Sequence, residues 1–288
     1  MNGTLLSTVI VTYNCYEYLE KCIKSIYKYN DIGSQLEIIV VDNGTDESYQ
    51  KIKGKYNDVI SFKNDNRGFG DGNNKGALVA SGKYILFLNP DTEFVMPVFK
   101  FAINVFENNP NIGCFGVRLI DTYGKHGPSY NIRFRFGLMD ELFSKICIKL
   151  GIFLPEKMYT SGADLFFDRD SFFEVGMFDS NIFMYFEETD VCERLNSIGK
   201  KVAFYPELKI IHHEGKTQNC NVSEVYLKTE KSKKYVCNKF GIDYFKLSKK
   251  ESRYCSFKML IFKLLHNERY EEYKKISKHW NEFYNQLN

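Results

Sequence analysis

The sequence predicts an α/β fold in which a mostly parallel, Rossmann-like sheet is flanked by helices. Two observations lead to this prediction. Short apolar runs alternate with segments in which apolar residues recur every three or four positions, and this alternation is typical of a doubly wound sheet. Several of these runs also stop abruptly at polar or glycine residues, as strands do at the ligand-binding carboxyl edge of a sheet. The 288-residue chain is 44% hydrophobic and 26% charged, which suits a globular protein with a sizeable core.

The predicted strands in the first third of the chain are mostly continuous apolar runs, as expected for strands buried on both faces. The run Ser7–Thr12 is β-branched, and Tyr84–Leu88 ends shortly before Pro90, which cannot donate to a strand ladder. Apolar residues spaced for one helix face predict helices between the strands. The predicted strands are 7–12, 36–41, 59–62 and 84–88; the predicted helices lie around 19–26, begin near 46–48, and cover 72–80 after a loop at 64–70.

The later elements are shorter and more aromatic. The stretch 118–156 has a weak pattern that predicts no element. Beyond residue 215 the chain is lysine-rich and helical in pattern. The remaining expected elements are helices at 99–106 and from Glu187, and strands at 112–117, 165–167, 202–205 and 209–212.

Charge divides the chain unevenly. Counting Lys and Arg against Asp and Glu, residues 1–215 carry a net charge of −5 and residues 216–288 a net charge of +8. We therefore expect an acidic α/β domain over 1–215, suited to holding a metal, and a basic helical extension over 216–288 that meets an anionic surface. Within the extension, residues 257–265 interleave apolar side chains with Lys258 and Lys263. This pattern fits a segment lying in a membrane interface, or a helix packed on the domain with solvated lysines.

Cysteine usage and hydropathy predict a cytoplasmic protein. The eight cysteines are scattered without a Cys-x-x-Cys pair, which argues against a zinc site and against a disulfide framework. The start of the chain has no charged leader before an apolar core, and no apolar run approaches the roughly 20 residues that span a bilayer. We expect reduced thiols.

The turn Asn89-Pro90-Asp91 ends the fourth predicted strand and places a carboxylate at the carboxyl edge of the sheet. A carboxylate fixed there is suited to holding a divalent cation against a phosphate. The alternative is that Asp91 caps the next helix, whose pattern begins near Met96.

Further acids and imidazoles stand at strand ends or helix starts, in Asp42, the cluster Glu187–Asp190 and the pair His212-His213. If these features converge on one edge, Asp91 and a histidine ligate Mn²⁺ or Mg²⁺, and Asp42 accepts hydrogen bonds from a base or ribose. A carboxylate near the metal-bound phosphate then serves as general base toward an incoming hydroxyl.

Each of these features also has a structural explanation. Acids are favoured at a helix start by the macrodipole, and Asp190 and Arg194 form an ordinary i,i+4 pair. Asp42 has the sequence context of an Asx-turn, and a His-His pair in a strand is commonly structural or solvated.

The glycine-rich segment 68–72 does not match the dinucleotide fingerprint. The third glycine of that motif should fall at Asn73, and the segment follows the third strand rather than the first. No P-loop is present. These failures argue against a nicotinamide-dependent oxidoreductase.

The combination of motifs is more specific than any one of them. The motifs are Val-Thr-Tyr-Asn (11–14), Val-Val-Asp-Asn (40–43), Asn-Arg-Gly-Phe-Gly (66–70) with Asn73-Asn74, Leu-Asn-Pro-Asp-Thr (88–92), Ser-Gly-Ala (161–163), Gly-Met-Phe-Asp (176–179), Phe-Met-Tyr-Phe-Glu-Glu-Thr-Asp (183–190) and His-His-Glu-Gly (212–215). Together and in this order, over about residues 7–217, they resemble the family-two glycosyltransferases of the GT-A fold. The Asn-Pro-Asp form and the Phe-Met-Tyr-Phe-Glu run look like the rhamnosyltransferase-like branch, which builds bacterial surface polysaccharides.

The resemblance implies roles for the matching residues. Asp91 and His212 would be metal ligands, with His212 contacting metal or diphosphate. Glu188 would be the catalytic base, with Glu187 and Asp190 as the next candidates. The residues implied to contact the nucleotide, sugar or phosphate are Thr12, Tyr13, Asp42, Asn66, Gly68, Asn74, Asn89, Asp91 and Thr217.

Two positions depart from the family pattern. Asn89 replaces the first carboxylate of the family's Asp-x-Asp metal motif, so that a single carboxylate is left. Glu188 stands where the family usually has Asp, and the extra methylene displaces the carboxylate by roughly an ångström, which matters for a positioned base.

We therefore expect an inverting, metal-dependent glycosyltransferase with a nucleotide-diphosphate sugar donor. The expected acceptor is a hydroxyl of a growing, lipid-linked bacterial polysaccharide at the inner face of the membrane. The branch suggests rhamnose as the sugar, with hexoses and N-acetylhexosamines on uridine diphosphate as alternatives. The competing hypothesis is a non-catalytic protein of the same fold that binds a nucleotide sugar, or that recruits membrane or nucleic acid through its basic extension; on the transferase hypothesis no nucleic-acid partner is expected.

Overall fold

The computed structural model describes residues 3–134, 137–213 and 222–285, which form two compact units. Among these residues, the first unit contains 3–131, 153–183 and 187–213, and the second contains 132–134, 137–152, 184–186 and 222–285. The domain boundary expected after residue 215 lies in 214–221, outside the described residues, as does Thr217.

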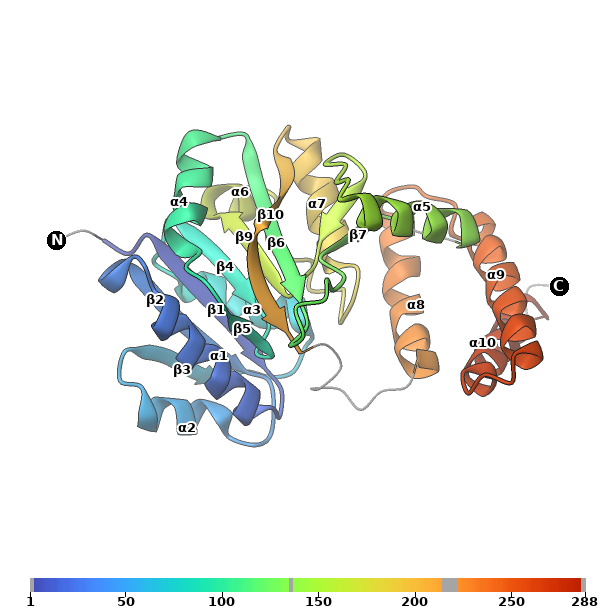
Figure 1. Cartoon of the computed structure of the whole chain (residues 1–288), viewed down its shortest axis with the longest axis horizontal. Coiled ribbons are helices and arrows are strands. Elements are labelled where there is room, and N and C mark those ends of the chain that lie inside the picture. The colour runs from blue at the N-terminus through green and yellow to red at the C-terminus, as the bar shows by residue number, and fades with distance from the viewer. Residues whose placement is uncertain (1–2, 135–136, 214–221, 286–288) are drawn as a thin grey trace. The chain divides into compact units, whose positions relative to one another are not determined.

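The first unit is built on an eight-stranded sheet with the strand order β3-β2-β1-β4-β9-β6-β10-β5 (Figure 1). The four strands from β3 to β4 are parallel, and so are β6 and β10. β9 runs antiparallel to both of its neighbours, and β5 runs antiparallel to β10. The strands are β1 (Leu6–Thr12), β2 (Leu36–Asp42), β3 (Val59–Lys63), β4 (Tyr84–Leu88), β5 (Thr92–Phe94), β6 (Ile112–Ile120), β9 (Asp164–Asp168) and β10 (Lys201–His212); β7 (Tyr130–Ile132) and β8 (Met158–Thr160) form a separate pair.

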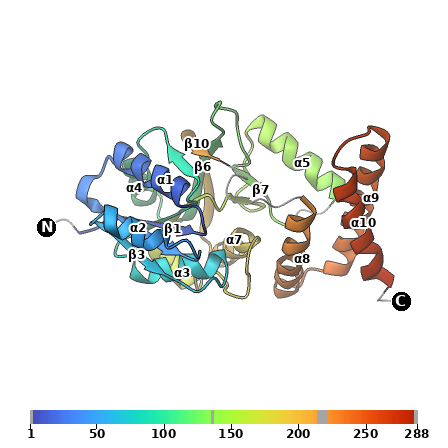
Figure 2. The ribbon, with the colours of Figure 1, turned by 90° about the horizontal axis from the view of Figure 1, so that it is seen from below.

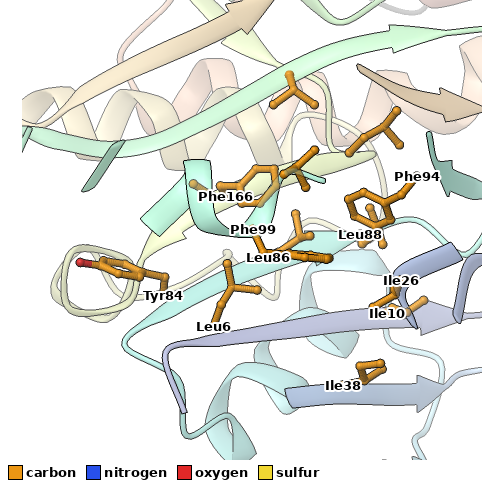
Figure 3. Close-up of a cluster of buried hydrophobic side chains, with 14 of the residues drawn as sticks. Leu6, Ile10, Ile26, Ile38, Tyr84, Leu86, Leu88, Phe94, Phe99 and Phe166 are labelled. Carbon is orange, nitrogen blue, oxygen red and sulfur yellow. The ribbon is translucent and has the colours of Figure 1, made fainter. Parts of the chain in front are cut away.

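Helices cover both faces of the sheet, as the turned view in Figure 2 also shows. On one face, Leu6, Ile10 and Phe166 of the sheet belong to the same apolar cluster as Ile26 of α1 and Phe99 of α4 (Figure 3). The opposite face packs against α3, α6 and α7. Fully burying each such side chain contributes about 1.5–3 kcal/mol, so the two clusters hold the strand ends firmly. The helices of this unit are α1 (Tyr16–Tyr29), a 3₁₀ turn (Gly33–Gln35), α2 (Ser48–Lys55), α3 (Phe69–Val79), α4 (Phe99–Asn108), α6 (Arg169–Glu174) and α7 (Glu187–Ser197).

The predicted α/β class and the mostly parallel sheet are confirmed, but two details of the prediction were wrong. The two short strands expected at 202–205 and 209–212 are one strand, β10, whose pairing with β6 shifts register around Pro206, a residue without an N–H to donate. Helix α3 begins at Phe69 rather than at residue 72, directly after Gly68. The unassigned stretch 118–156 contains the end of β6, the strand β7 and the helix α5.

The second unit is helical. Its core gathers Cys237, Tyr244, Cys255, Ile276 and Trp280. Within the described ranges, no helix is long and apolar enough to cross a bilayer, and the seven cysteines described there are free thiols. The helices of this unit are α5 (Gly137–Leu150), α8 (Val222–Lys239), α9 (Tyr244–Leu264) and α10 (Tyr270–Asn285).

Candidate active site

The ends of β1 and β2 bring Thr12 and Asp42 together, because these residues are partners in the parallel ladder and both are fully buried. The Asp42 carboxylate accepts hydrogen bonds from two backbone N–H groups, those of Gly44 (2.8 Å) and Tyr49 (3.2 Å). The Asx-turn considered from the sequence is therefore present. Asp42 orders the loop that follows β2.

Tyr13 and Asn14 continue beyond β1 at the same edge. Asn14 has a left-handed backbone (φ 51°), and its Oδ1 accepts hydrogen bonds from the backbone N–H groups of Thr45 (2.6 Å) and Asp46 (3.2 Å). Asn14 thus ties the loop after β1 to the loop after β2. No role was predicted for Asn14 from the sequence, although Asn favours left-handed positions. The Tyr13 side chain is 54% exposed beside this junction, where a flat ring can stack on a base or ribose.

Gly68 lies where only glycine fits. Its φ is +117°, and a Cβ there would collide with the carbonyl group of Phe183, whose oxygen accepts the Phe69 N–H (3.0 Å). Close approach of backbone to backbone is one of the positions that require glycine. This contact fastens the start of α3 to the segment that precedes α7.

Asn74 and Asn66 are placed very differently. Asn74 is buried on α3, and its side-chain amide exchanges two hydrogen bonds with the backbone of Phe178 (2.8 and 3.0 Å). Its amide therefore reinforces the link between α3 and the segment before α7. Asn66 is exposed in the loop between β3 and α3.

Asp91 lies in the turn between β4 and β5 and is only 4% exposed. Its Oδ1 is 3.4 Å from Nε2 of His212, because β5 pairs with β10 and places Thr92 opposite His212. The His213 backbone N–H donates to the Asp91 carbonyl oxygen (2.9 Å). Asp91 does not cap a helix, since β5 follows it and α4 begins only at Phe99. The structure therefore excludes the capping alternative and brings together the carboxylate and imidazole predicted to share a cation.

A carboxylate oxygen and an imidazole nitrogen are ligands that suit Mn²⁺. His212 Nδ1 is buried without a hydrogen-bond partner in the described part of the chain. Asn89 adds no carboxylate, and over the described ranges no group of three His, Cys, Asp or Glu side chains is arranged to hold a metal. Asp91 and His212 therefore offer two ligands, and a cation held between them would need further oxygen ligands from outside the protein.

Glu187 and Glu188 open α7. Glu187 is 2% exposed, and burial, reinforced by the neighbouring Glu188 charge, raises the pKa of its carboxyl well above the usual range. Glu188 is half-buried, and burial also raises its pKa, against the opposing effect of the backbone N–H groups of Glu188 and Gly162. A carboxylate with a raised pKa is a stronger base, which suits proton abstraction near neutral pH.

Asp190 differs from these two glutamates. It is fully buried and forms the expected i,i+4 ion pair with Arg194, whose Nε lies 2.9 Å from Asp190 Oδ2. Arg194 also donates to the carbonyl oxygen of Val175. Asp190 therefore anchors α7 to the segment before it.

The turn 161–163 connects the segment that carries Asp91 to Glu188 at the start of α7. The Asn89 N–H donates to the carbonyl oxygen of Ala163 (3.0 Å), while the preceding Gly162 lies against the Glu188 carboxylate so closely that a Cβ on Gly162 would overlap it. Asn89 is two residues from Asp91. One short turn thus contacts both the segment that carries Asp91 and the Glu188 carboxylate.

Asp164 is a buried acid that the sequence analysis missed. It stands opposite Leu88 in the β4–β9 ladder and is fully buried, and its Oδ2 accepts the Val117 N–H (2.7 Å). Its Oδ1 has no partner in the part of the chain that the structure describes, and burial raises its pKa well above the usual range. The available signal was a carboxylate directly before the apolar run Leu165–Phe167.

Residues 7–178, more than half of the chain, match the family model described as Glycosyl transferase family 2. The chain belongs to this family. The resemblance inferred from the motifs is therefore confirmed.

Two curated relatives illustrate the range within the family. The glucosyl-dolichyl phosphate glucuronosyltransferase of Haloferax volcanii is 24% identical over 223 residues, which is 72% of this chain and 68% of that protein. The N-acetylglucosaminyl-diphospho-decaprenol L-rhamnosyltransferase of Mycobacterium tuberculosis is 23% identical over 241 residues, which is 73% of this chain and 76% of that protein.

Solved structures confirm the GT-A fold. The mannosyltransferase PcManGT from Pyrobaculum calidifontis, in complex with GDP-Man and Mn²⁺, superposes with a TM-score of 0.59 at 14% identity and matches 80% of this chain. GalNAc-T7, solved with UDP, GalNAc and Mn²⁺, has a TM-score of 0.61 at 18% identity and matches 82% of this chain. The family 2 chain spans only 62% and 48% of the length of these two proteins, so the likeness concerns the fold.

Proposed function

We propose that this family 2 protein is an inverting glycosyltransferase that moves a sugar from a nucleotide-diphosphate donor to an acceptor hydroxyl. The observation that carries the proposal is the turn 161–163, which links the Asp91–His212 pair to Glu188. An inverting glycosyl transfer needs a leaving diphosphate held on one side of the anomeric carbon and a base on the other. The proposed catalytic domain is residues 1–215, with 216–288 as its basic helical extension.

The nucleotide is proposed to bind at the ends of β1 and β2. The exposed Tyr13 ring and the ordered loop around Asp42 and Asn14 support this assignment. Thr12 contributes to the floor of this region, and Asn66, Gly68, Asn74 and Thr217 complete the proposed set of nucleotide, sugar and phosphate contacts. The solved relatives with GDP-Man or UDP support a nucleotide-diphosphate sugar as donor class.

Asp91 and His212 are proposed to hold Mn²⁺ or Mg²⁺ together with diphosphate oxygens. When bound, such a cation offsets the negative charge that develops on the departing diphosphate. Asp91 is held in place for this task by the backbone hydrogen bond from His213 and by the β5–β10 pairing. Mn²⁺ in the two solved relatives supports a divalent metal.

Glu188 is proposed to take the proton of the acceptor hydroxyl while the hydroxyl oxygen attacks the anomeric carbon. The new carbon–oxygen bond forms as the bond to the diphosphate breaks, and the electron pair leaves with the nucleoside diphosphate. Glu188 is preferred over Glu187 because its side chain is half-buried rather than enclosed, and over Asp190 because the latter is engaged by Arg194. A positioned base of this kind typically contributes about 10²–10⁴-fold.

The acceptor is proposed to be a lipid-linked saccharide at the cytoplasmic face of the membrane. Both curated relatives carry a polyprenyl phosphate or diphosphate in their names, and one is a rhamnosyltransferase. Rhamnose is accordingly our first proposal for the transferred sugar in a bacterial surface polysaccharide, ahead of hexoses and N-acetylhexosamines.

A panel of sugar nucleotides tests the proposal. Purified full-length protein is incubated with each donor and Mn²⁺, and release of nucleoside diphosphate is followed with and without EDTA. We expect turnover of one donor that is lost with EDTA and in Asp91→Ala, and that persists in Glu174→Ala, which removes an exposed carboxylate at the end of α6. No binding of any donor would overturn the transferase proposal. Binding without turnover, even with a polyprenyl-linked saccharide present, would favour the non-catalytic alternative.

A further inference from the structure

Helix α5 exposes apolar side chains along its whole length. Six of them are between 41% and 76% exposed, and at 100° per residue they occupy about 140° of the helix circumference. Surface helices of globular proteins normally turn such a stripe toward the core. The six residues are Leu138, Met139, Leu142, Phe143, Ile146 and Leu150.

The opposite side of α5 is the one that packs, and it is largely polar. Glu141 accepts hydrogen bonds from the hydroxyl of Tyr254 and, at 3.3 Å, from Nζ of Lys258, both on α9. Ser144 and Cys147 are buried on the same side. The helix is therefore held by hydrogen bonds and an ion pair while its apolar side faces outward. An arrangement of this kind marks an interaction surface.

Helix α9, which packs against the polar side of α5, also exposes apolar side chains. Phe257, Leu260 and Leu264, in its second half, are 49%, 52% and 71% exposed. Its first half exposes mainly basic side chains, together with Phe245, which is 43% exposed. The contacts of Glu141 with Tyr254 and Lys258 join the two helices within one unit. We call the exposed apolar residues of α5 and α9 the docking face.

All exposed charges on these two helices are positive. On α5 they are Lys145 and Lys149; on α9 they are Lys246, Lys249, Lys250, Arg253 and Lys263. The structure describes both helices completely, and none of their acids is exposed: Asp140 and Glu141 are half-buried, and Glu251 is buried in an ion pair with Lys233 (2.7 Å). By contrast, α10 exposes both signs, with Glu271 and Lys278 among its exposed residues.

We propose that the docking face binds the surface of an anionic lipid bilayer. Aliphatic and aromatic side chains would enter the boundary between headgroups and acyl chains, and the surrounding lysines and Arg253 would meet lipid phosphates and carboxylates. A second copy of this chain fits less well, because two uniformly positive faces would oppose each other across the interface. A nucleic acid would use the positive charges but leave the apolar side chains exposed.

The docking proposal deepens the proposed function, because a lipid-linked acceptor lies at such a surface. It rests on the proposed function only for the reason why this protein would bind a membrane. Vesicle binding needs neither donor nor acceptor. Turnover without vesicle binding would overturn the docking proposal alone, whereas vesicle binding without turnover would overturn the transferase alone.

The test is flotation of the full-length protein with vesicles of phosphatidylcholine, with or without phosphatidylserine. We expect binding to the anionic vesicles that weakens as salt rises. The double change Lys149→Gln with Lys249→Gln should lower the partition constant about 25-fold, since each lysine near an anionic surface contributes about fivefold. The matched control Lys278→Gln on α10 should leave it unchanged.

The apolar side chains are tested separately. Ile146→Ser with Leu150→Ser should lower binding at least tenfold, while Leu78→Ser, an equally exposed leucine on α3, should not. Far-ultraviolet circular dichroism and thermal unfolding check that each variant folds. Equal binding to neutral vesicles, absence of binding to anionic vesicles, or a concentration-dependent dimer that the Ile146/Leu150 variant dissociates would each overturn the proposal.

Discussion

Gly162 offers a direct test of which glutamate is the base. Its backbone lies outside the left-handed region, so alanine is conformationally allowed there. The Cβ of an alanine would, however, fall within van der Waals range of the Glu188 carboxylate, whose Cδ would lie 3.1 Å away and whose Oε1 would lie closer still. The Gly162→Ala change therefore acts on Glu188 and leaves the sheet intact.

The size of the effect follows from this geometry. A carbon and a carboxylate oxygen need roughly 3.5 Å, so the Glu188 carboxylate has to move by about 1 Å. A displacement of that size at a positioned group costs on the order of 100-fold in rate, which corresponds to about 2.7 kcal/mol of activation free energy. Donor binding should change little, because Gly162 touches neither the Asp91–His212 pair nor the ends of β1 and β2 in any described contact.

The assay is release of nucleoside diphosphate under saturating donor, with Gly54→Ala as the control. Gly54 lies in α2 with no atom near the position of an added Cβ, so its replacement by alanine should leave the rate unchanged. A second change separates displacement from unfolding. Glu188→Asp shortens the side chain by one methylene and should slow the wild-type protein but speed the Gly162→Ala variant, because it relieves the overlap.

Two results would refute this reasoning. If Gly162→Ala and Gly54→Ala are equally active, the Glu188 carboxylate does not take part in the rate-limiting step. If Glu188→Asp slows both backgrounds by the same factor, Gly162 and Glu188 are not coupled, and Glu187 becomes the candidate base.

Three further predictions concern other parts of the site. Asp91→Ala or His212→Ala should lower metal-dependent turnover by about 10²-fold or more, measured with and without EDTA, whereas His213→Ala should be milder because that imidazole faces Glu93. The Asp164→Asn variant should become more stable relative to wild type as pH rises. The buried Asp164 carboxyl has a raised pKa, so above the unfolded pKa near 4 its ionisation favours the unfolded chain by up to about 1.4 kcal/mol per pH unit. Urea unfolding that gave the same difference in unfolding free energy between variant and wild type at pH 4 and pH 6 would contradict this prediction. The Gly68→Ala variant should lose about 1–3 kcal/mol of stability, because residue 68 has a positive φ and an added Cβ would meet the Phe183 carbonyl. This loss would be measured as a lower Tm, and an unchanged Tm would show that the turn relaxes.

The strand ends that form the site were predictable because their signals are local. Tyr84–Leu88 is a continuous apolar run, and Pro90 stops it within two residues, so the position of Asp91 at the sheet edge follows from nearby sequence. The start of α7 at Glu187 is equally local. These short-range cues place the carboxylates in the correct elements.

The features that the sequence analysis missed depend on distant partners. The three-residue strand β5 exists because it pairs with β10, more than a hundred residues away along the chain. Asp164 is buried because β9 inserts between β4 and β6. Helix α5 and its outward apolar side were missed for a different reason, since the stretch 118–156 shows no clear periodicity in the sequence. Long-range pairing and surface function both lie beyond a local pattern.

The two residues immediately before α7 have a consequence for how this protein can be cut or recombined. Tyr185 and Phe186 both have positive φ, 67° and 74°, which is unfavourable for bulky side chains and persists only with support from neighbours. That support comes from α8: the Ser232 hydroxyl donates to the Met184 carbonyl oxygen (2.9 Å), and Lys233 Nζ lies 5.9 Å from the centre of the Phe186 ring. A chain shortened before α8 would lose both contacts while keeping every residue proposed for chemistry. Exchange of carboxy-terminal segments between relatives should therefore move Met184–Phe186 together with α8 as one cassette.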